Sequence, residues 1–278
     1  MTRALLCVMA AASALTAQAP DPREIMTRAV TRDQMNWEKA KAYTYFSRTT
    51  VRETDSKGNI TKTERKVNEV LILFGQPYEK LIEKDGKPLT GKDLAKEQEK
   101  LDKLLAKRQK ETESERAKRL ADFEKERRQQ REFAREIPKA FTFQMVGEEQ
   151  VGGRRAWIID AKPRPEFRST VRHAHLLNKF EGRMWVDQAE NQLVRVDAKA
   201  IDTVSFGLFL ARIGKGTRFY FEQTRVNDEV WMPKAVKVTL DARLGLIKHL
   251  QGDVDVQFDG FRKFQTDSKI VSTAEVRN

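Results

Sequence analysis

The sequence predicts an α+β protein built on one strongly curved antiparallel sheet, an incomplete β-barrel, with an N-terminal helix and an inserted charged helical hairpin. Three observations support this prediction. Apolar and β-branched residues recur at every second position over residues 43–82 and 140–264, the period of a strand with one buried face. A helical period leads the chain over residues 22–41. Residues 90–136 are mostly charged and contain one glycine, as expected of long exposed helices.

The first nineteen residues have the composition of an export signal. A short positive start precedes the uncharged apolar residues 4–16, and Ala17-Gln18-Ala19 supplies the small-x-small pattern that a signal peptidase reads. The apolar run is shorter than the roughly 20 residues that a spanning helix needs. We therefore expect residues 1–19 to be a cleaved signal peptide and residues 20–278 to form one β-rich periplasmic domain. The only cysteine, Cys7, lies in the signal, so no disulfide is predicted in the mature chain.

A meander is predicted after the first helix. Tyr43, Tyr45 and Thr49 would share one face of a strand, because side chains alternate along the backbone. Residues 55–59 read as a turn. They are followed by a second long strand over 60–74 and a third over 77–82.

The charged stretch that follows predicts two helices inserted at about residues 90–137. Thr90 followed by Asp93 can cap the first helix, and Thr112 followed by Glu115 has the pattern of a capping box that starts the second. The apolar line along both helices is thin, which favours a hairpin that protrudes or lies over the sheet as a lid. A nucleic-acid-binding helix is a weaker interpretation, because acidic and basic residues nearly balance here.

In the second half of the chain the pattern predicts consecutive strands with no helices between them. This pattern indicates one curved or partly closed antiparallel sheet. The expected strands cover residues 141–151, 156–161, 182–186, 193–198, 217–226, 230–240 and 252–264.

The formal net charge of +12 bears on possible partners. Outside the cytoplasm, the polyanions available are phospholipid head groups and other acidic polymers of the envelope rather than nucleic acid. Attraction to an anionic membrane surface and a merely soluble basic surface both remain open.

Motifs of catalysis are absent from the sequence. It contains no phosphate-binding loop and no Gly-x-Ser-x-Gly, the pattern of a nucleophile elbow. His173 and His175 would share one face of a strand and could begin a metal site, but a third and fourth ligand are not marked. Asp253 and Asp255 alternate as on a half-exposed strand. We therefore predict no enzyme activity, no metal and no cofactor.

Aromatic residues occur on nearly every expected strand. A curved sheet with few helices has too little material to fill its inner face, which predicts an apolar groove of the kind that binds small molecules. Ordinary core packing is the alternative, since periodicity does not measure a cavity. The candidate groove-lining residues are Tyr45, Leu73, Trp185, Phe206, Leu208, Phe219 and Phe221.

One hairpin carries a resemblance to a known group. The segment Gly182-Arg183-Met184-Trp185-Val186-Asp187, followed by residues 191–197, resembles a hairpin of the periplasmic lipoprotein-carrier superfamily, which is LolA/LolB-like and includes RseB-like sensors. The resemblance implies an incomplete antiparallel barrel closed on one side by helices, with an apolar cavity for acyl chains. The charged helical insertion is not a usual part of these carriers, so the chain resembles a distant relative.

These observations support two functional hypotheses. The first is non-enzymatic binding, in the periplasm, of a lipid-like or acyl-chain ligand in an apolar groove, with a lipid or an acylated protein as partner and a role in transport toward the outer membrane. It needs no reactive group, because burying an acyl chain contributes about 0.8 kcal/mol per methylene. The second is an envelope interaction protein that uses the charged hairpin as a docking arm and binds no ligand. The oligomeric state is not predicted.

Overall fold

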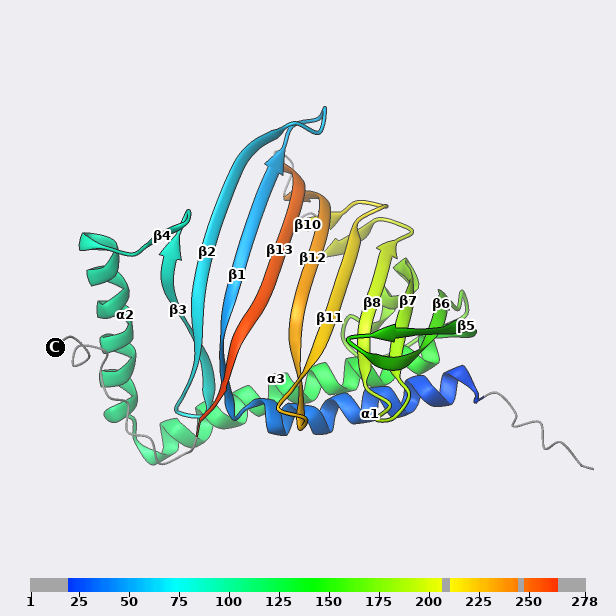
Figure 1. Cartoon of the computed structure of the whole chain (residues 1–278), viewed down its shortest axis with the longest axis horizontal. Helices are drawn as coiled ribbons and strands as arrows, with labels where there is room; N and C mark the ends of the chain where they lie inside the picture. Colours follow the sequence, from blue (N-terminus) through cyan, green and yellow to red (C-terminus); the bar gives the residue numbers. More distant parts are fainter. Residues whose placement is uncertain (1–19, 207–210, 245–247, 265–278) are drawn as a thin grey trace, which may run out of the picture.

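One antiparallel sheet of thirteen strands dominates the computed structural model, which describes residues 20–206, 211–244 and 248–264. Within these residues, three α-helices lie beside the sheet and one short 3-10 helix packs on it (Figure 1). The sheet is curved and does not close, so the predicted fold class is confirmed.

The helices are α1 (Pro22–Ala40), α2 (Gly91–Gln109), α3 (Glu113–Ala140) and the 3-10 helix η1 (Ala174–Lys179). The strands of the first half are β1 (Tyr43–Thr54), β2 (Ile60–Leu73), β3 (Gln76–Lys84), β4 (Lys87–Pro88), β5 (Phe141–Val151) and β6 (Arg154–Pro163). Those of the second half are β7 (Phe180–Asp187), β8 (Leu193–Ala200), β9 (Val204–Phe206), β10 (Ala211–Ile213), β11 (Arg218–Val226), β12 (Val230–Leu244) and β13 (Lys248–Lys263).

The strand order explains the long helix α3. The main path runs β4-β3-β2-β1-β13-β12-β11-β8-β7-β6-β5, with β9 and β10 attached beside β12. Eleven strands spaced about 4.8 Å apart make a sheet roughly 48 Å wide. The chain leaves β4 at one edge and enters β5 at the other, and α3, with 28 residues, is about 42 Å long. Figure 1 shows α3 crossing under the strands beside α1.

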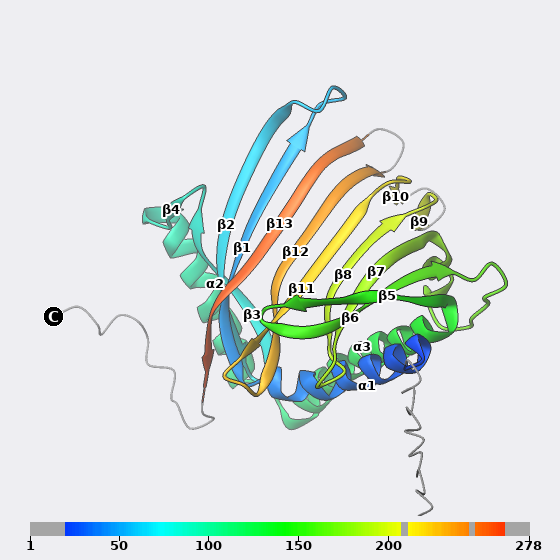
Figure 2. The ribbon, with the colours of Figure 1, turned by 45° about the vertical axis from the view of Figure 1, so that its right-hand side comes forward.

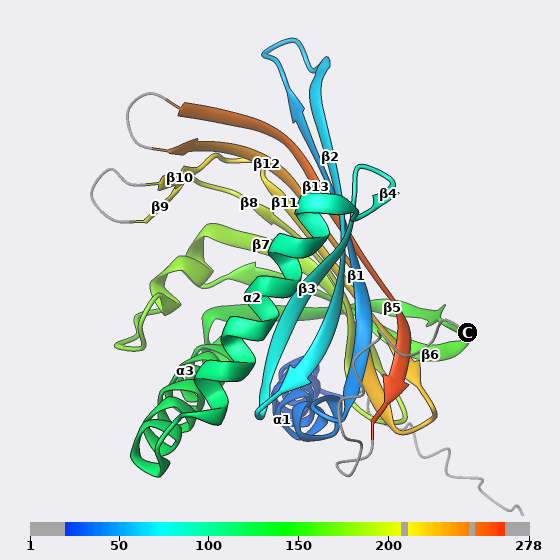
Figure 3. The ribbon, with the colours of Figure 1, turned by 90° about the vertical axis from the view of Figure 1, so that its left-hand side faces the viewer.

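The charged hairpin is therefore placed differently from the lid or protrusion that its composition favours. Helix α3 is the crossover between the two edges, and its last turns are buried with the core. Helix α2 stands beside β3, of which the short edge strand β4 pairs only with the last two residues (Figure 3). The carboxylate of Glu97, which is buried, accepts a hydrogen bond of 3.2 Å from the backbone N–H of Leu81 in β3. An otherwise open sheet edge is covered in this way.

The main core lies where α1, α3 and η1 pack on β5–β8. Figure 2 shows β5 and β6 running across the direction of the other strands. Ile25, Met26 and Ala29 of α1 form one cluster with Ile159 of β6 and Val186 of β7. Asp21 caps the start of α1 by accepting a bond from the N–H of Arg23.

Among the local predictions for caps and histidines, one is confirmed and two are corrected. Thr112 and Glu115 form the predicted capping box. Thr90 precedes α2, but its side chain makes no capping bond. His173 and His175 do not lie on a strand: His173 has a φ of 64° and precedes η1, which contains His175.

Candidate ligand-binding site

The central strands carry two rows of apolar side chains on one face of the sheet. Register places the residues of each row directly opposite one another across four neighbouring strands, so their side chains point to the same side. The first row is Phe221, Val236, Val256 and Thr49, and the second is Phe219, Val238, Val254 and Val51. We call these eight residues the apolar rows.

The opposite face of the same strands is polar. Tyr220, which alternates with the two phenylalanines of β11, faces Lys237 of β12, and Lys237 forms an ion pair with Asp255 of β13. Arg52 of β1 pairs with Asp253 at 2.6 Å. Asp253 and Asp255 thus lie on the solvent-facing side, as a half-exposed strand predicts.

The apolar rows are on the face that the helices share, but none of the helices in the described part of the chain covers them. Val196 of β8 lies opposite Phe221 and packs against the core cluster under α1, so the core and the rows lie on one face. Seven residues of the rows are only half-buried, and Phe219 is 38% exposed. In Figure 3 the upper ends of β12 and β13 incline toward the side of α2 and α3, which puts the rows on the inner side of the curve.

A cavity lies at the end of this face, where the sheet divides. Pairing between β12 and β13 ends at Ala235 opposite Gln257, and below this point β12 continues with β11 alone while β13 continues with β1. Pro233 follows the break, and proline is suited to a free edge because it has no N–H for a ladder. Helix α1 covers the opening, and a cavity of about 230 Å³ remains between the helices and the sheet.

Asn36 of α1 takes the place of the missing strand partner. Its Nδ2 donates to the carbonyl oxygen of Trp231 at 2.7 Å, and its Oδ1 accepts from the N–H of Trp231 at 2.8 Å. Both backbone groups of Trp231, at the free edge of β12, are thereby satisfied, as buried backbone polar groups require.

Aromatic side chains line much of the cavity. Tyr45 contributes to its wall and contacts Phe258 and Phe261, with ring centroids 5.9 and 5.8 Å apart. Burial raises the pKa of Tyr45, so its phenol is neutral at ordinary pH. Tyr43 is fully buried beside it and bonds Glu229 and Asn227. Because Tyr45 and Thr49 share a face of β1, the cavity wall continues into the apolar rows.

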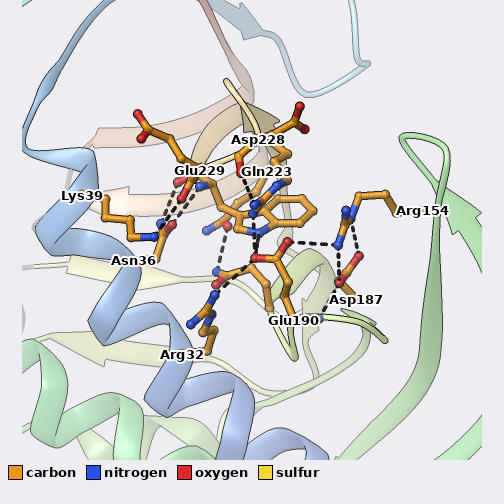
Figure 4. A network of polar contacts seen from close by, with 12 residues as sticks. Arg32, Asn36, Lys39, Arg154, Asp187, Glu190, Gln223, Asp228 and Glu229 are labelled. Carbon is orange, nitrogen blue, oxygen red and sulfur yellow. Dashed lines mark hydrogen bonds and ion pairs between the residues drawn. The ribbon is translucent and has the colours of Figure 1, made fainter. Parts of the chain in front are cut away.

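A buried polar network holds α1 against the hairpins around the cavity (Figure 4). Asp187, which is 1% exposed, accepts two hydrogen bonds from Arg154, at 2.7 and 3.0 Å. Glu190 of the same hairpin accepts bonds from Arg154, from Arg225 at 2.6 Å and from the indole of Trp231. Arg32 of α1 also reaches Glu190, at 3.3 Å.

The network includes the end of segment 182–187, the hairpin strand that resembles the lipoprotein carriers. Asp187, the last residue of the quoted segment, binds Arg154 and also accepts from the N–H of Glu190 in the following turn. The hydrogen bond to Asp187 raises the pKa of Arg154. The segment therefore secures helix and sheet, and its acidic residue does not line the cavity.

The structure brings three of the predicted groove residues to one face. Tyr45 lines the cavity, and Phe219 and Phe221 belong to the apolar rows. Register connects all three through Thr49, Val256 and their neighbours.

Leu73 and Trp185 are not brought to this site. Leu73 is buried, but Ile72, its neighbour on the other face of β2, lines the cavity instead. Trp185 lies opposite Arg195, whose partner is Glu222, and so faces the polar side; it is 9% exposed and contributes to a separate polar hollow. Leu208 and the side chain of Phe206 lie outside the described residues.

Two residues of the site carry no signal in the sequence. Asn36 and Arg127 lie in helices rich in polar residues, and neither belongs to a motif or a spacing that marks it. Only the packing of α1 and α3 under the divided sheet places them beside the cavity.

The described residues contain no group of three or more His, Cys, Asp or Glu side chains able to hold a metal ion. Among the same residues, no helix is long and apolar enough to cross a membrane.

Comparisons with known proteins find similarity among solved structures. No family model and no curated protein matches the chain. A domain named for outer-membrane lipoprotein sorting, from Vibrio parahaemolyticus, is 12% identical, with 88% of this chain and 95% of that chain covered and a TM-score of 0.33. A LolA superfamily protein from Nitrosomonas europaea is 10% identical, covering 89% and 95%, with a TM-score of 0.28. MucB in its complex with MucA, from Pseudomonas aeruginosa, is 11% identical, covering 88% and 99%, with a TM-score of 0.22.

The group that the sequence resembles is thus found again among the similar structures. At these identities and TM-scores the similarity adds nothing on ligand or partner, which must be inferred from the chain's own geometry.

Proposed function

We propose that this protein binds the acyl chain of a lipid or of an acylated protein along the apolar rows, as a carrier or sensor in the periplasm. The observation that carries the proposal is the contrast between the two faces of one set of strands. One face is a continuous half-exposed apolar surface, and the other is paired charge. Large exposed apolar surfaces on a protein generally mark a binding site.

The shape of the surface favours a thin, flexible ligand. The rows lie on the inner side of a curved sheet, and a cavity with aromatic walls continues them at one end. Thr49 lies four residues from Tyr45 along β1, roughly 13 Å, so one extended chain can contact both regions. Each buried methylene contributes about 0.8 kcal/mol, so binding needs no reactive group. Export, predicted from residues 1–19, would bring the protein to a compartment with lipids and lipoproteins.

Binding of a neutral apolar dye, N-phenyl-1-naphthylamine, tests the proposal with two adjacent substitutions. Val238→Asp puts a charge into the apolar rows, whereas Thr239→Asp puts the same charge on the exposed opposite face. We expect dye fluorescence to rise when the dye binds the wild-type protein. In Val238→Asp the apparent affinity for the dye should fall at least tenfold, because binding must then desolvate a carboxylate. Thr239→Asp should bind like the wild type.

Equal binding by both variants would show that the dye does not occupy the rows. Circular dichroism and the midpoint of urea unfolding verify that each variant is folded.

Mass spectrometry of an organic extract of the purified protein is an independent measurement, and co-purified lipid is the expected result. A clean extract together with no dye binding would favour the docking-arm hypothesis instead.

A further inference from the structure

Arg127 of α3 is a cation at the cavity that has no ion-pair partner among the residues described by the structure. Its guanidinium lies over the ring of Trp37 at 3.7 Å and lines the cavity. Counting bonds to the described residues, one of its five N–H donors is used, from Nη1 to the side-chain oxygen of Gln130 at 2.6 Å. Its Nε is buried and has no acceptor among the described residues. Burial lowers the pKa of Arg127, but an arginine stays charged at ordinary pH.

The carboxylates near Arg127 are engaged elsewhere. Asp33 accepts from the amides of Gln192, at 3.2 Å, and Gln223. Glu124 pairs with Arg131, and Glu38 pairs with Lys41, the other cation that lines the cavity. Among the described residues, none of the three forms an ion pair with Arg127. A half-buried cation in this state favours an added anion, because a charge removed from water needs compensation.

We propose that the ligand is an anionic amphiphile whose carboxylate or phosphate group binds Arg127, while its alkyl chain runs past Tyr45 along the apolar rows. This inference rests on the proposed function and adds the charge of the ligand's polar end. The planar fork of an arginine can bind either group through two parallel hydrogen bonds, and the aromatic ring under it holds the fork in one orientation.

Displacement of N-phenyl-1-naphthylamine by two competitors with the same chain tests the inference. Dodecanoate carries a charge, and its methyl ester does not. On the wild-type protein we expect dodecanoate to displace the dye at a concentration at least tenfold lower than the ester does. In Arg127→Gln this preference should disappear, and Arg127→Lys should retain part of it. Arg128→Gln, which removes the same charge from the adjacent exposed position, should leave the preference unchanged.

The outcomes separate the two proposals. Failure of the wild-type protein to bind the dye or either competitor would overturn the proposed function. Dye binding with equal displacement by acid and ester, or an equal loss in Arg127→Gln and Arg128→Gln, would overturn the inference about Arg127 alone. Dodecyl phosphate, added as a third competitor, distinguishes the two anions: the one that displaces the dye at the lower concentration is the better model of the natural polar group.

Discussion

The helix-bearing face of the sheet is sealed over β5–β8 and open over β11–β13 and β1. In the sealed region, Ile159 and Val186 have no exposed surface and pack against α1. In the open region, Val238 and Val254 occupy equivalent inward positions but stay half-buried. The same alternation of apolar residues thus gives core at one end and an uncovered surface at the other.

Simple dimensions account for this difference. A helix is about 10–12 Å wide, so α1 and α3 side by side cover roughly 20 Å of strand length. Strand β13 has 16 residues and is about 53 Å long. Since both helices lie across the lower ends of the strands, they leave most of the length of the longest strands uncovered within residues 20–206, 211–244 and 248–264 (Figure 1). Covering elements, and not the strands themselves, decide which region becomes a site.

The largest effect is expected from breaking the polar network that holds α1 against the hairpins around the cavity. Arg154→Met leaves the carboxylate of Asp187 buried without its main partner, which should lower the free energy of unfolding by about 3–5 kcal/mol. Urea unfolding followed by circular dichroism measures this change in the free energy of unfolding.

The control is Arg48→Met on the solvent-facing side. Arg48 pairs with Asp259 at 2.6 Å, but both side chains are 48% exposed, so the loss should be at most about 1 kcal/mol. Similar losses in the two variants would contradict the buried role of the network.

A pair of identical truncations compares the two regions directly. Val186→Ala, in the sealed core, should cost about 2 kcal/mol of unfolding free energy, because it removes buried methyl groups and leaves a cavity. Val238→Ala, in the apolar rows, should cost less than about 1 kcal/mol and weaken dye binding. If both truncations destabilise equally, the rows are core and not a binding surface.

The sequence predicted local structure well, because period, turn residues and caps are local signals. Tyr43 and Tyr45 share one face of β1 as expected, and Thr112 starts α3 with its capping box. The course of α3 could not be predicted in the same way. Its role as a crossover depends on the strand order, which brings β4 and β5 to opposite edges, and no residue of α3 encodes that distance.

The site was only partly predictable, for two physical reasons. Residues 184–187 of β7 are buried on both faces, so alternation does not tell whether Trp185 faces the helices, and the structure puts it on the polar side. The cavity depends on the break in pairing between β12 and β13, which is a tertiary feature. Pro233 lies next to this break, but a single proline in the sequence does not predict it. The predicted export signal, residues 1–19, lies outside the described residues and stays a prediction.

The smallest effect is expected on the polar face of the sheet, where the pKa of Tyr220 should not change when a ligand binds. Tyr220 lies between the two phenylalanines of β11 but points to the polar side, where its hydroxyl donates to Glu222. Burial, followed by the bond to this carboxylate, raises the pKa of Tyr220 from 10.0 to about 12. A raised pKa in the folded state contributes stability below pH 10 that is lost as the pH rises from about 10 to 12.

Ultraviolet difference absorbance of the phenolate, compared with Tyr220→Phe, measures this titration. Because a chain bound on the apolar rows lies on the other side of the backbone, saturation with dodecanoate should leave the pKa of Tyr220 unchanged. The pKa of Tyr45, which lines the cavity, should rise further when the anion and its chain exclude water. A shift at Tyr220 with none at Tyr45 would mean that the ligand binds the polar face, and would reverse the assignment of the two sides.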